Sequence, residues 1–193
     1  MEQQLEFAFK GSRNYVHGTS LFNAALDVAR GQGVAAGTID LAFKHMITTP
    51  RCLVALGKPG PQDAVAARIL DDAGNSLELG INPAHGDAAG EVQRMAYDEA
   101  AICRDSEISS TSITLASSSH DDAIEVLVAL CKKMHQASID GTKKWVFSRY
   151  RGTVPLPTLE NIEIVTTKRV GVRLTCNAVY VGEHKIGDMF FSC

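Results

Sequence analysis

The sequence lacks a strong excess of charge of either sign. Its 193 residues include 19 Lys and Arg against 22 Asp and Glu, so the net charge is −3. Such a chain exerts little long-range attraction on nucleic acid or on an anionic membrane surface, and we expect neither as a partner. No apolar run is long enough to span a bilayer. These absences favour a soluble protein.

Paired cysteines are also missing. The five cysteines are odd in number, widely spaced and mostly set among apolar neighbours, and no Cys-x-x-Cys or His-x-x-x-His pair occurs. This pattern is typical of reduced core residues, and it predicts neither a metal site nor a resident cofactor. The first four residues are acidic and polar, whereas a secretory leader begins basic and turns apolar, so we expect a cytoplasmic protein.

The first part of the chain predicts a strand, a helix and then more strands. Residues 5–9 alternate as a strand does, and Thr19 or Ser20 can cap a helix that ends near Gly31. Apolar or alternating runs that suit strands follow at 38–44, 52–56, 65–70 and 76–81. The Asp/Gly/Asn stretch at 72–75 predicts a hairpin turn between the last two strands.

The last part of the chain repeats this order. Residues 107–115 alternate as a strand, and the polar run 117–122 is rich in helix-capping residues. A helix is predicted next, with Lys132, Lys133 and His135 at the end that favours positive charge. Its apolar stripe consists of Ile124, Leu127, Val128, Cys131 and Met134. Four further strands are predicted at 144–150, 162–167, 170–180 and 185–191.

A connector separates the two repeats. Its composition shifts to small and charged residues, and an amphipathic helix is predicted over its second half. The residues that recur with helical spacing there are Val92, Met95, Ala96, Glu99 and Ile102. The predicted organisation is therefore a first unit at 1–82, a connector at 83–105 and a second unit at 106–193.

An antiparallel sheet wrapped around a helix, in the order strand–helix–strands and occurring twice, resembles the hotdog superfamily. The resemblance implies an α+β double hotdog fold, built from two β-α-β-β-β(β) units. It also implies an enzyme that acts on acyl thioesters of coenzyme A or acyl carrier protein, as a thioesterase, dehydratase or hydratase. The sequence has neither the Asp-x-Asn-x-x-His run of the hydratases nor the His-Phe-Pro-Gly run of the dehydratases.

The loop before the first helix holds the candidate catalytic residues His17, Asn23 and Tyr15. His17 is the candidate general base, because an imidazole titrates near neutral pH. Gly18 and Thr19 are candidate substrate contacts, since a helix N-terminus can stabilise negative charge on a carbonyl oxygen. Asn23 or Asp27 could orient water or the imidazole. The plainer interpretation of His17 is a helix-capping residue.

The second repeat offers weaker candidates and a basic group. His120 occupies the place that matches His17, and Glu125 lies one turn into the helix. The basic residues are Arg149, Arg151, Lys168, Arg169 and Arg173, of which Arg149 and Arg151 are candidate substrate contacts. They would suit the phosphates of coenzyme A or an acidic carrier protein, although an ordinary solvated sheet face is the plainer interpretation.

The leading hypothesis is an acyl-thioester-acting enzyme with one working site between the two units, where His17 is the base. The alternative is a non-enzymatic module that binds an acyl group or small molecule, or that serves assembly, on the same fold. Exposed sheet edges and many apolar strands predict a homo-oligomer in either case.

Overall fold

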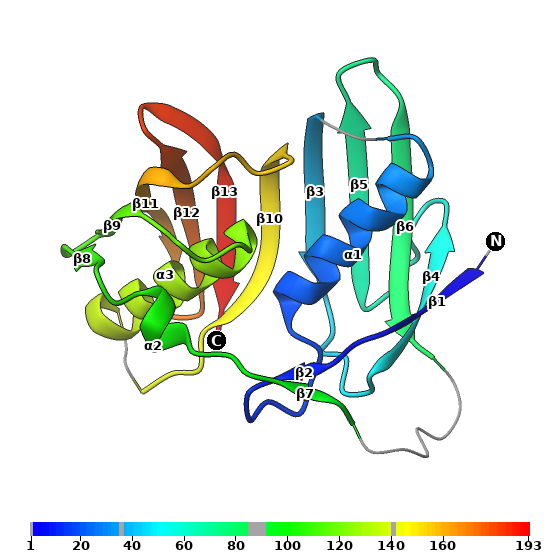
Figure 1. Ribbon diagram of the computed structural model, residues 1–193, viewed down its shortest axis with the longest axis horizontal. Coiled ribbons are helices and arrows are strands. Elements are labelled where there is room, and N and C mark those ends of the chain that lie inside the picture. Colours follow the sequence, from blue (N-terminus) through cyan, green and yellow to red (C-terminus); the bar gives the residue numbers. More distant parts are fainter. Residues whose placement is uncertain (1, 35–36, 85–91, 140–141) are drawn as a thin grey trace. The chain divides into compact units, whose positions relative to one another are not determined.

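The computed structural model describes residues 2–34, 37–84, 92–139 and 142–193. The chain divides into two compact units, Met1–Tyr97 and Asp98–Cys193. Each unit packs one long helix against an antiparallel sheet, as Figure 1 shows. The division falls inside the connector predicted at 83–105.

The sheet of the first unit has the strand order β1-β4-β6-β5-β3, and every neighbouring pair is antiparallel. The strands are β1 (Glu2–Glu6), β3 (Gly37–Phe43), β4 (Arg51–Leu56), β5 (Val65–Asp71) and β6 (Ser76–Pro83). Helix α1 (Gly18–Gly31) crosses this sheet in Figure 1. Its buried face includes Phe22, Ala25 and Ala29, so the core of the unit lies between α1 and the sheet.

The hairpin between β5 and β6 forms where the sequence predicts it. Asp71 accepts hydrogen bonds from the backbone and side-chain nitrogens of Asn75, at 2.7 and 2.9 Å. Gly74 has a φ of +86°, a conformation that glycine adopts without steric cost. The predicted strands at 38–44 and 52–56 are confirmed as β3 and β4.

Two local predictions in the first unit are wrong. The strand predicted at 5–9 is divided into β1 and a short β2 (Phe9–Lys10), which pairs in parallel with β7 (Arg94–Met95). Helix α1 begins before Thr19, with His17 as its N-cap residue in an extended conformation. Thr19 lies inside the first turn, where its hydroxyl group is hydrogen-bonded to the side chains of Lys10 and His17.

The amphipathic helix predicted in the connector is also wrong. Arg94 and Met95 pair their backbones with β2, so this part of the segment is extended. Among the described residues of the connector, only α2 (Glu99–Ile102) is helical, and Asp98 caps it by accepting a hydrogen bond from the Ala101 N–H. The start of the predicted connector overlaps 85–91, which lies outside the described residues.

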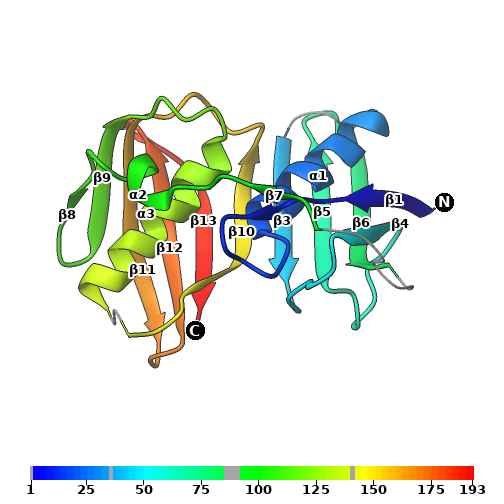
Figure 2. The same ribbon diagram turned by 60° about the horizontal axis from the view of Figure 1, so that its bottom comes forward.

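The sheet of the second unit has the strand order β10-β13-β12-β11-β9-β8 and is antiparallel throughout. Its strands are β8 (Glu107–Ile108), β9 (Ser112–Ser117), β10 (Val146–Val154), β11 (Glu160–Val170), β12 (Leu174–Val181) and β13 (His184–Ser192). Helix α3 (Ala123–Ser138) lies against this sheet in Figure 2. The predicted strand at 107–115 is interrupted, because Ser109 and Ser112 form a turn between β8 and β9.

The predicted apolar stripe of α3 is confirmed, since all five of its residues are buried. His135 belongs to this core and does not serve as a surface charge at the helix end. Its Nδ1 lies 2.6 Å from the carbonyl oxygen of Cys131, and its Nε2 lies 2.7 Å from the hydroxyl oxygen of Thr175. Burial lowers the pKa of His135 to about 4, so its ring is neutral at pH 7. No helix in the described ranges is long and apolar enough to cross a bilayer.

Candidate functional site

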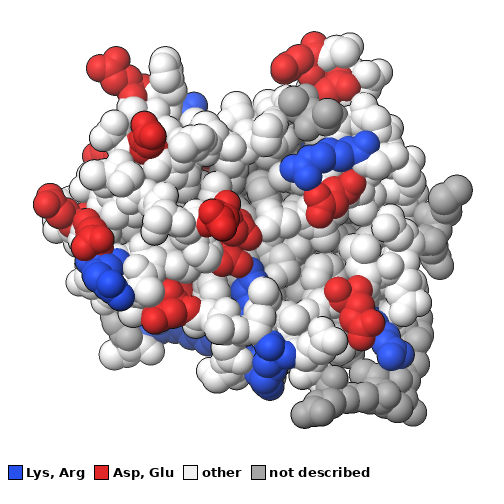
Figure 3. Space-filling view, viewed as in Figure 1, with Lys and Arg blue, Asp and Glu red and all other residues white. Residues whose placement is uncertain are grey.

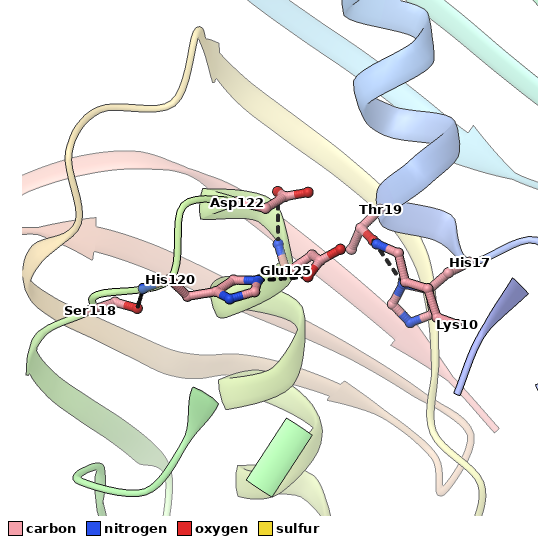
Figure 4. A network of polar contacts seen from close by, with 7 residues as sticks. All are labelled: Lys10, His17, Thr19, Ser118, His120, Asp122 and Glu125. Atoms are coloured by element: carbon pink, nitrogen blue, oxygen red, sulfur yellow. Dashed lines mark hydrogen bonds and ion pairs between the residues drawn. The ribbon is translucent and has the colours of Figure 1, made fainter. Parts of the chain in front are cut away.

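Three buried polar side chains meet at the N-terminus of α1. Lys10, His17 and Thr19 are 3%, 5% and 0% exposed. The Nζ of Lys10 donates a hydrogen bond of 2.8 Å to the Thr19 hydroxyl oxygen, and the His17 Nδ1 lies 2.7 Å from the same oxygen. Figure 4 shows these side chains turned toward one another. Buried polar groups are costly unless they are hydrogen-bonded, and Thr19 links the other two.

The ring of Tyr97 packs over this cluster. The Lys10 Nζ lies 5.4 Å from the centre of the Tyr97 ring, and the Arg13 Cζ lies 4.7 Å from it. The rings of His17 and Tyr97 have their centres 5.2 Å apart. The parallel pairing of β2 with β7 brings Tyr97 to this place, although the two strands are far apart in the sequence.

Two arrangements of protons satisfy the distances around His17. In the first, the Thr19 hydroxyl donates to Nδ1, and Nε2 then carries the ring proton. In the second, Nδ1 donates to Thr19 and Nε2 has a lone pair that can accept a proton. In both, Thr19 fixes the orientation of the ring, so His17 is suited to hold or move a proton at Nε2.

The other residues predicted around His17 are less closely grouped. Gly18 is the first residue of α1 and Thr19 contacts His17 directly. Tyr15 is half-buried in the loop before the helix. Asn23 lies one turn beyond Thr19 and lines a groove of about 370 Å³ between α1 and the β1 segment. The groove residues are Gln3, Leu5, Glu6, Phe7, Ser20, Asn23, Ala24, Asp27, Val28, Gly31 and Gln32.

The N-terminus of α3 carries a different cluster. His120 Nε2 lies 2.6 Å from a carboxylate oxygen of Glu125, whose side chain is only 9% exposed. Asp122 caps the helix by accepting a hydrogen bond from the Glu125 N–H. The backbone N–H of His120 donates to the Ser118 hydroxyl oxygen, as Figure 4 also shows. His120 is therefore held by a carboxylate, whereas His17 is held by a hydroxyl group.

Arg149 and Arg151 do not lie on the α3 side of the second sheet. They pair with Phe190 and Asp188 of β13, while the alternate residue Phe191 contacts the α3 residue His135. Paired residues in an antiparallel sheet point to the same face, so both arginines lie on the face opposite α3. The Cζ of Arg149 lies 5.9 Å from the centre of the Phe190 ring.

Two members of the α1 cluster were not predicted as site residues. Lys10 stands in an apolar stretch, Phe7-Ala8-Phe9-Lys10, which was the only available sign that this lysine is buried. Tyr97 carries no comparable signal, because its position depends on the pairing of β2 with β7. The predicted location of the site between the two units stays a prediction.

No protein-family model matches the sequence, and no curated protein matches it closely enough to count as a relative. Solved structures do match the fold. The dehydratase domain of PpsC from Mycobacterium tuberculosis, in complex with C12:1-CoA, has a TM-score of 0.53 at 10% identity. This match covers 99% of the present chain and 92% of the other.

Two further structures agree. A protein from Novosphingobium aromaticivorans, provisionally assigned as a thioesterase, has a TM-score of 0.51 at 9% identity and covers 99% of this chain and 93% of its own. The dehydratase domain of a mycocerosic acid synthase-like polyketide synthase has a TM-score of 0.50 at 8% identity, with 93% and 82% covered. At such low identity these likenesses show the fold alone. The chain has the double hotdog fold, as its element order predicts.

Proposed function

We propose that this double hotdog protein is an enzyme that acts on acyl thioesters. The observation that carries the proposal is the buried cluster of His17, Thr19 and Lys10 at the N-terminus of α1. A thioester reaction needs a group that accepts a proton and a positive environment for the carbonyl oxygen. In this proposal His17 is the proton acceptor, and the Lys10 amine and the start of α1 form the positive environment.

Each residue of the cluster has a distinct role in the proposal. Thr19 accepts a hydrogen bond from the Nδ1–H of His17, and the Nε2 lone pair then serves as the general base. The thioester carbonyl oxygen lies at the start of α1, where backbone N–H groups and the Lys10 amine stabilise its developing negative charge. Tyr97 covers the cluster and limits the access of water. Gly18 leaves room for the substrate to approach the backbone.

Two reactions fit this arrangement. In hydrolysis, His17 removes a proton from water, the water oxygen attacks the carbonyl carbon, and the carbon–sulfur bond breaks as the proton passes to the thiolate. In dehydration, His17 removes the proton from the carbon beside the carbonyl and returns it to the hydroxyl group on the next carbon, which leaves as water as the carbon–carbon double bond forms. The similar solved structures include dehydratase domains and a protein provisionally assigned as a thioesterase, which supports testing both.

The test is a panel of acyl-CoA thioesters of different chain length and of 3-hydroxyacyl and 2-enoyl thioesters. Release of free thiol reports hydrolysis, and the ultraviolet absorbance of the enoyl thioester reports dehydration or hydration. We expect turnover of at least one substrate class by the wild-type protein. The His17→Gln variant should lose about 10²- to 10⁴-fold in kcat, which is the usual contribution of a general base.

The matched control is His45→Gln, because His45 belongs to the same unit but is exposed. This variant should keep the wild-type rate. Turnover that is absent from the wild type, or equal in the two variants, would contradict the proposal. Tight binding of an acyl thioester without any turnover would instead support the non-enzymatic binding module.

A further inference from the structure

Three apolar side chains are exposed at the turn between β11 and β12. Val170, Val172 and Leu174 are 51%, 61% and 36% exposed. Val170 and Leu174 pair across the hairpin, so their side chains point to the same face of the sheet, and Val172 lies in the turn itself. All of the residues 167–174, which we call the hairpin tip, are exposed. In Figure 2 the hairpin tip is the lowest part of the second unit, so its apolar side chains lie on a projecting turn.

Basic residues surround these apolar side chains. The Lys143 Nζ donates a hydrogen bond of 3.2 Å to the carbonyl oxygen of Val172, so the chain around Lys143 adjoins the hairpin tip. The Lys and Arg residues of the tip and of this adjoining stretch are Lys143, Lys144, Lys168, Arg169 and Arg173. Red side chains predominate over the face of the second unit in Figure 3, whereas blue ones lie along its lower edge. The hairpin tip therefore combines apolar surface with positive charge.

The described segments that meet at this end of the second unit contain no acidic residue. Hydrogen bonds link Ser138 to Ser109 and Thr166 to Thr111, so the end of α3 and the turn before β9 lie beside β11. Neither Asp nor Glu occurs in the segments 108–113, 134–139, 142–146 and 164–176. Asp140, which precedes Lys143 in the sequence, lies outside the described residues.

The acidic residues nearest to the tip on β11 and β13 lie farther along the sheet. Glu163 is five positions from Lys168, which corresponds to about 16 Å of strand. Asp188 is bonded to Lys185, whose Nζ lies 2.8 Å from a carboxylate oxygen. No described acidic residue forms an ion pair with the tip residues Lys168, Arg169 and Arg173. Their positive charge is therefore presented to solvent.

Hydrogen bonds fix the shape of the turn. The Val172 carbonyl oxygen accepts a hydrogen bond of 3.2 Å from the Cys193 Sγ in addition to the one from Lys143. The Cys193 N–H donates to the Arg173 carbonyl oxygen at 3.1 Å. Gly171 has a φ of +57°, which glycine adopts without steric cost. The apolar and basic side chains are thus held at the surface before any partner arrives.

We propose that the hairpin tip binds the surface of an anionic lipid bilayer. The apolar side chains of the tip enter the boundary between headgroups and acyl chains, and its basic residues contact lipid phosphates. The binding is peripheral and reversible, since three apolar side chains bury little area. This inference is independent of the proposed function. It departs from the expectation of no membrane partner, which rested on the net charge of the whole chain.

A bilayer suits the tip better than another polyanion does. Nucleic acid and an acidic protein would both attract the basic residues, but nucleic acid has no apolar interior that could receive Val170 and Val172. A folded protein would need a cavity that matches the projecting turn, whereas a bilayer yields to the turn and covers it.

Vesicle sedimentation tests the proposal. One set of vesicles contains phosphatidylcholine alone, and the other contains equal amounts of phosphatidylcholine and phosphatidylglycerol. We expect the wild-type protein to bind the anionic vesicles at least about tenfold more tightly than the neutral ones, and added salt to weaken the binding. Equal binding to the two sets, or no binding to the anionic set, would overturn the proposal.

The charge variant is Lys168→Gln/Arg173→Gln. It should weaken binding to the anionic vesicles about tenfold or more, because each basic residue at such a surface contributes about a factor of five. The matched control is Lys58→Gln/Arg68→Gln, which removes two exposed basic residues from the first unit. A control that weakens binding as much as the charge variant would mean that the tip is not the contact.

The apolar variant is Val170→Ser/Val172→Ser, and its control is Leu70→Ser, at a residue that is 39% exposed in the first unit. The apolar variant should weaken vesicle binding about tenfold, because apolar side chains no longer leave water. Leu70→Ser should bind as the wild type does. Circular dichroism checks that each variant is folded. Wild-type binding by the apolar variant would contradict insertion and would favour a nucleic acid or an acidic protein as the partner.

A fluorescent reporter tests insertion without loss of the tip. Trp145, the one tryptophan in the sequence, is 3% exposed, so a second tryptophan introduced by Val172→Trp reports on the tip. Anionic vesicles that contain brominated lipids should quench the added fluorescence of this variant and leave the wild-type fluorescence unchanged. Absence of quenching in the bound variant would overturn the proposal. Thioester turnover is assayed without vesicles, so neither result affects the proposed function.

Discussion

The starts of α1 and α3 occupy the same place in the two repeats but carry opposite charge. At α1, the histidine is hydrogen-bonded to the hydroxyl group of Thr19, to which the amine of Lys10 also donates. At α3, the histidine is bonded to the buried carboxylate of Glu125, and Asp122 caps the helix. The two repeats therefore share a helix packed on a sheet but differ in the side chains at the helix start.

The helix dipole explains why this difference matters. Negative groups stabilise a helix N-terminus, and α3 supplies them with Asp122 and Glu125. The first turn of α1 holds no acidic residue, and a lysine lies beside it instead. The first turn of α1 therefore supplies no negative group to the helix N-terminus, and an anion from elsewhere would be stabilised there. This contrast is the reason for placing the substrate carbonyl at α1.

The largest expected effect is on thioester turnover, and it distinguishes the two histidines. His120→Gln should leave the thioester turnover within about twofold of wild type, whereas His17→Gln lowers it about 10²- to 10⁴-fold. The measurement is kcat for the best substrate of the panel, with both variants assayed side by side. A loss at His120 as large as that at His17 would show that both helix starts contribute to the chemistry.

The next effect concerns the buried histidine of the second core. The folded protein keeps His135 neutral down to a pKa of about 4, while the unfolded chain protonates this ring below 6.5. The stability that depends on the neutral ring is therefore complete above pH 6.5 and is lost as the pH falls from 6.5 to 4. The loss amounts to about 3 kcal/mol, since each pKa unit corresponds to about 1.4 kcal/mol.

Urea denaturation of the wild type and of His135→Asn at pH 7.5, 6 and 5 measures this effect. The free energy of unfolding should fall more steeply with acid in the wild type than in the variant. If the free energy of unfolding depends on pH equally in the two proteins, His135 is not the cause of the lower stability in acid.

A smaller effect compares glycines in the two sheets. A Cβ at Gly80 would overlap a carboxylate oxygen of Asp63, and a Cβ at Gly187 would lie 2.8 Å from both the Arg151 carbonyl and the Tyr150 hydroxyl oxygen. Gly80→Ala and Gly187→Ala should each lower the free energy of unfolding by about 1–3 kcal/mol. Gly31→Ala is the control, because no atom lies within 4 Å of its Cβ position. If thermal denaturation shows that Gly31→Ala destabilises the protein as much as the other two variants, the close packing at Gly80 and Gly187 is contradicted.

The smallest effect is at the α3 cap. Asp122→Ala removes the acceptor for the Glu125 N–H and should cost about 1 kcal/mol of stability. Chemical denaturation checks this value. An unchanged midpoint would mean that Glu125 or water replaces the lost cap.

Much of the fold could be predicted because its signals are local. The stripe from Ile124 to Met134 predicts α3, and the polar turn before Ser76 predicts the β5–β6 hairpin. The helix predicted in the connector is wrong because Arg94 pairs its backbone with Phe9, although the residues around it recur with helical spacing. Such long-range pairing leaves no trace in the local pattern.

The site could be predicted only in part. The loop position and side-chain chemistry of His17 point to it, and Thr19 follows from its place in the first turn. Lys10 was missed because lysine is usually exposed, and Tyr97 was missed because only the fold brings it to the cluster. The predicted homo-oligomer stays a prediction.

In the proposed function, the acyl thioester binds at the start of α1. The most direct test follows the ring Cε1–H signals of the histidines by NMR while a nonhydrolysable thioether analogue of acyl-CoA is added. We expect the His17 signal to shift during the titration and the His120 signal to stay in place. A shift at His120 with His17 unchanged would contradict it.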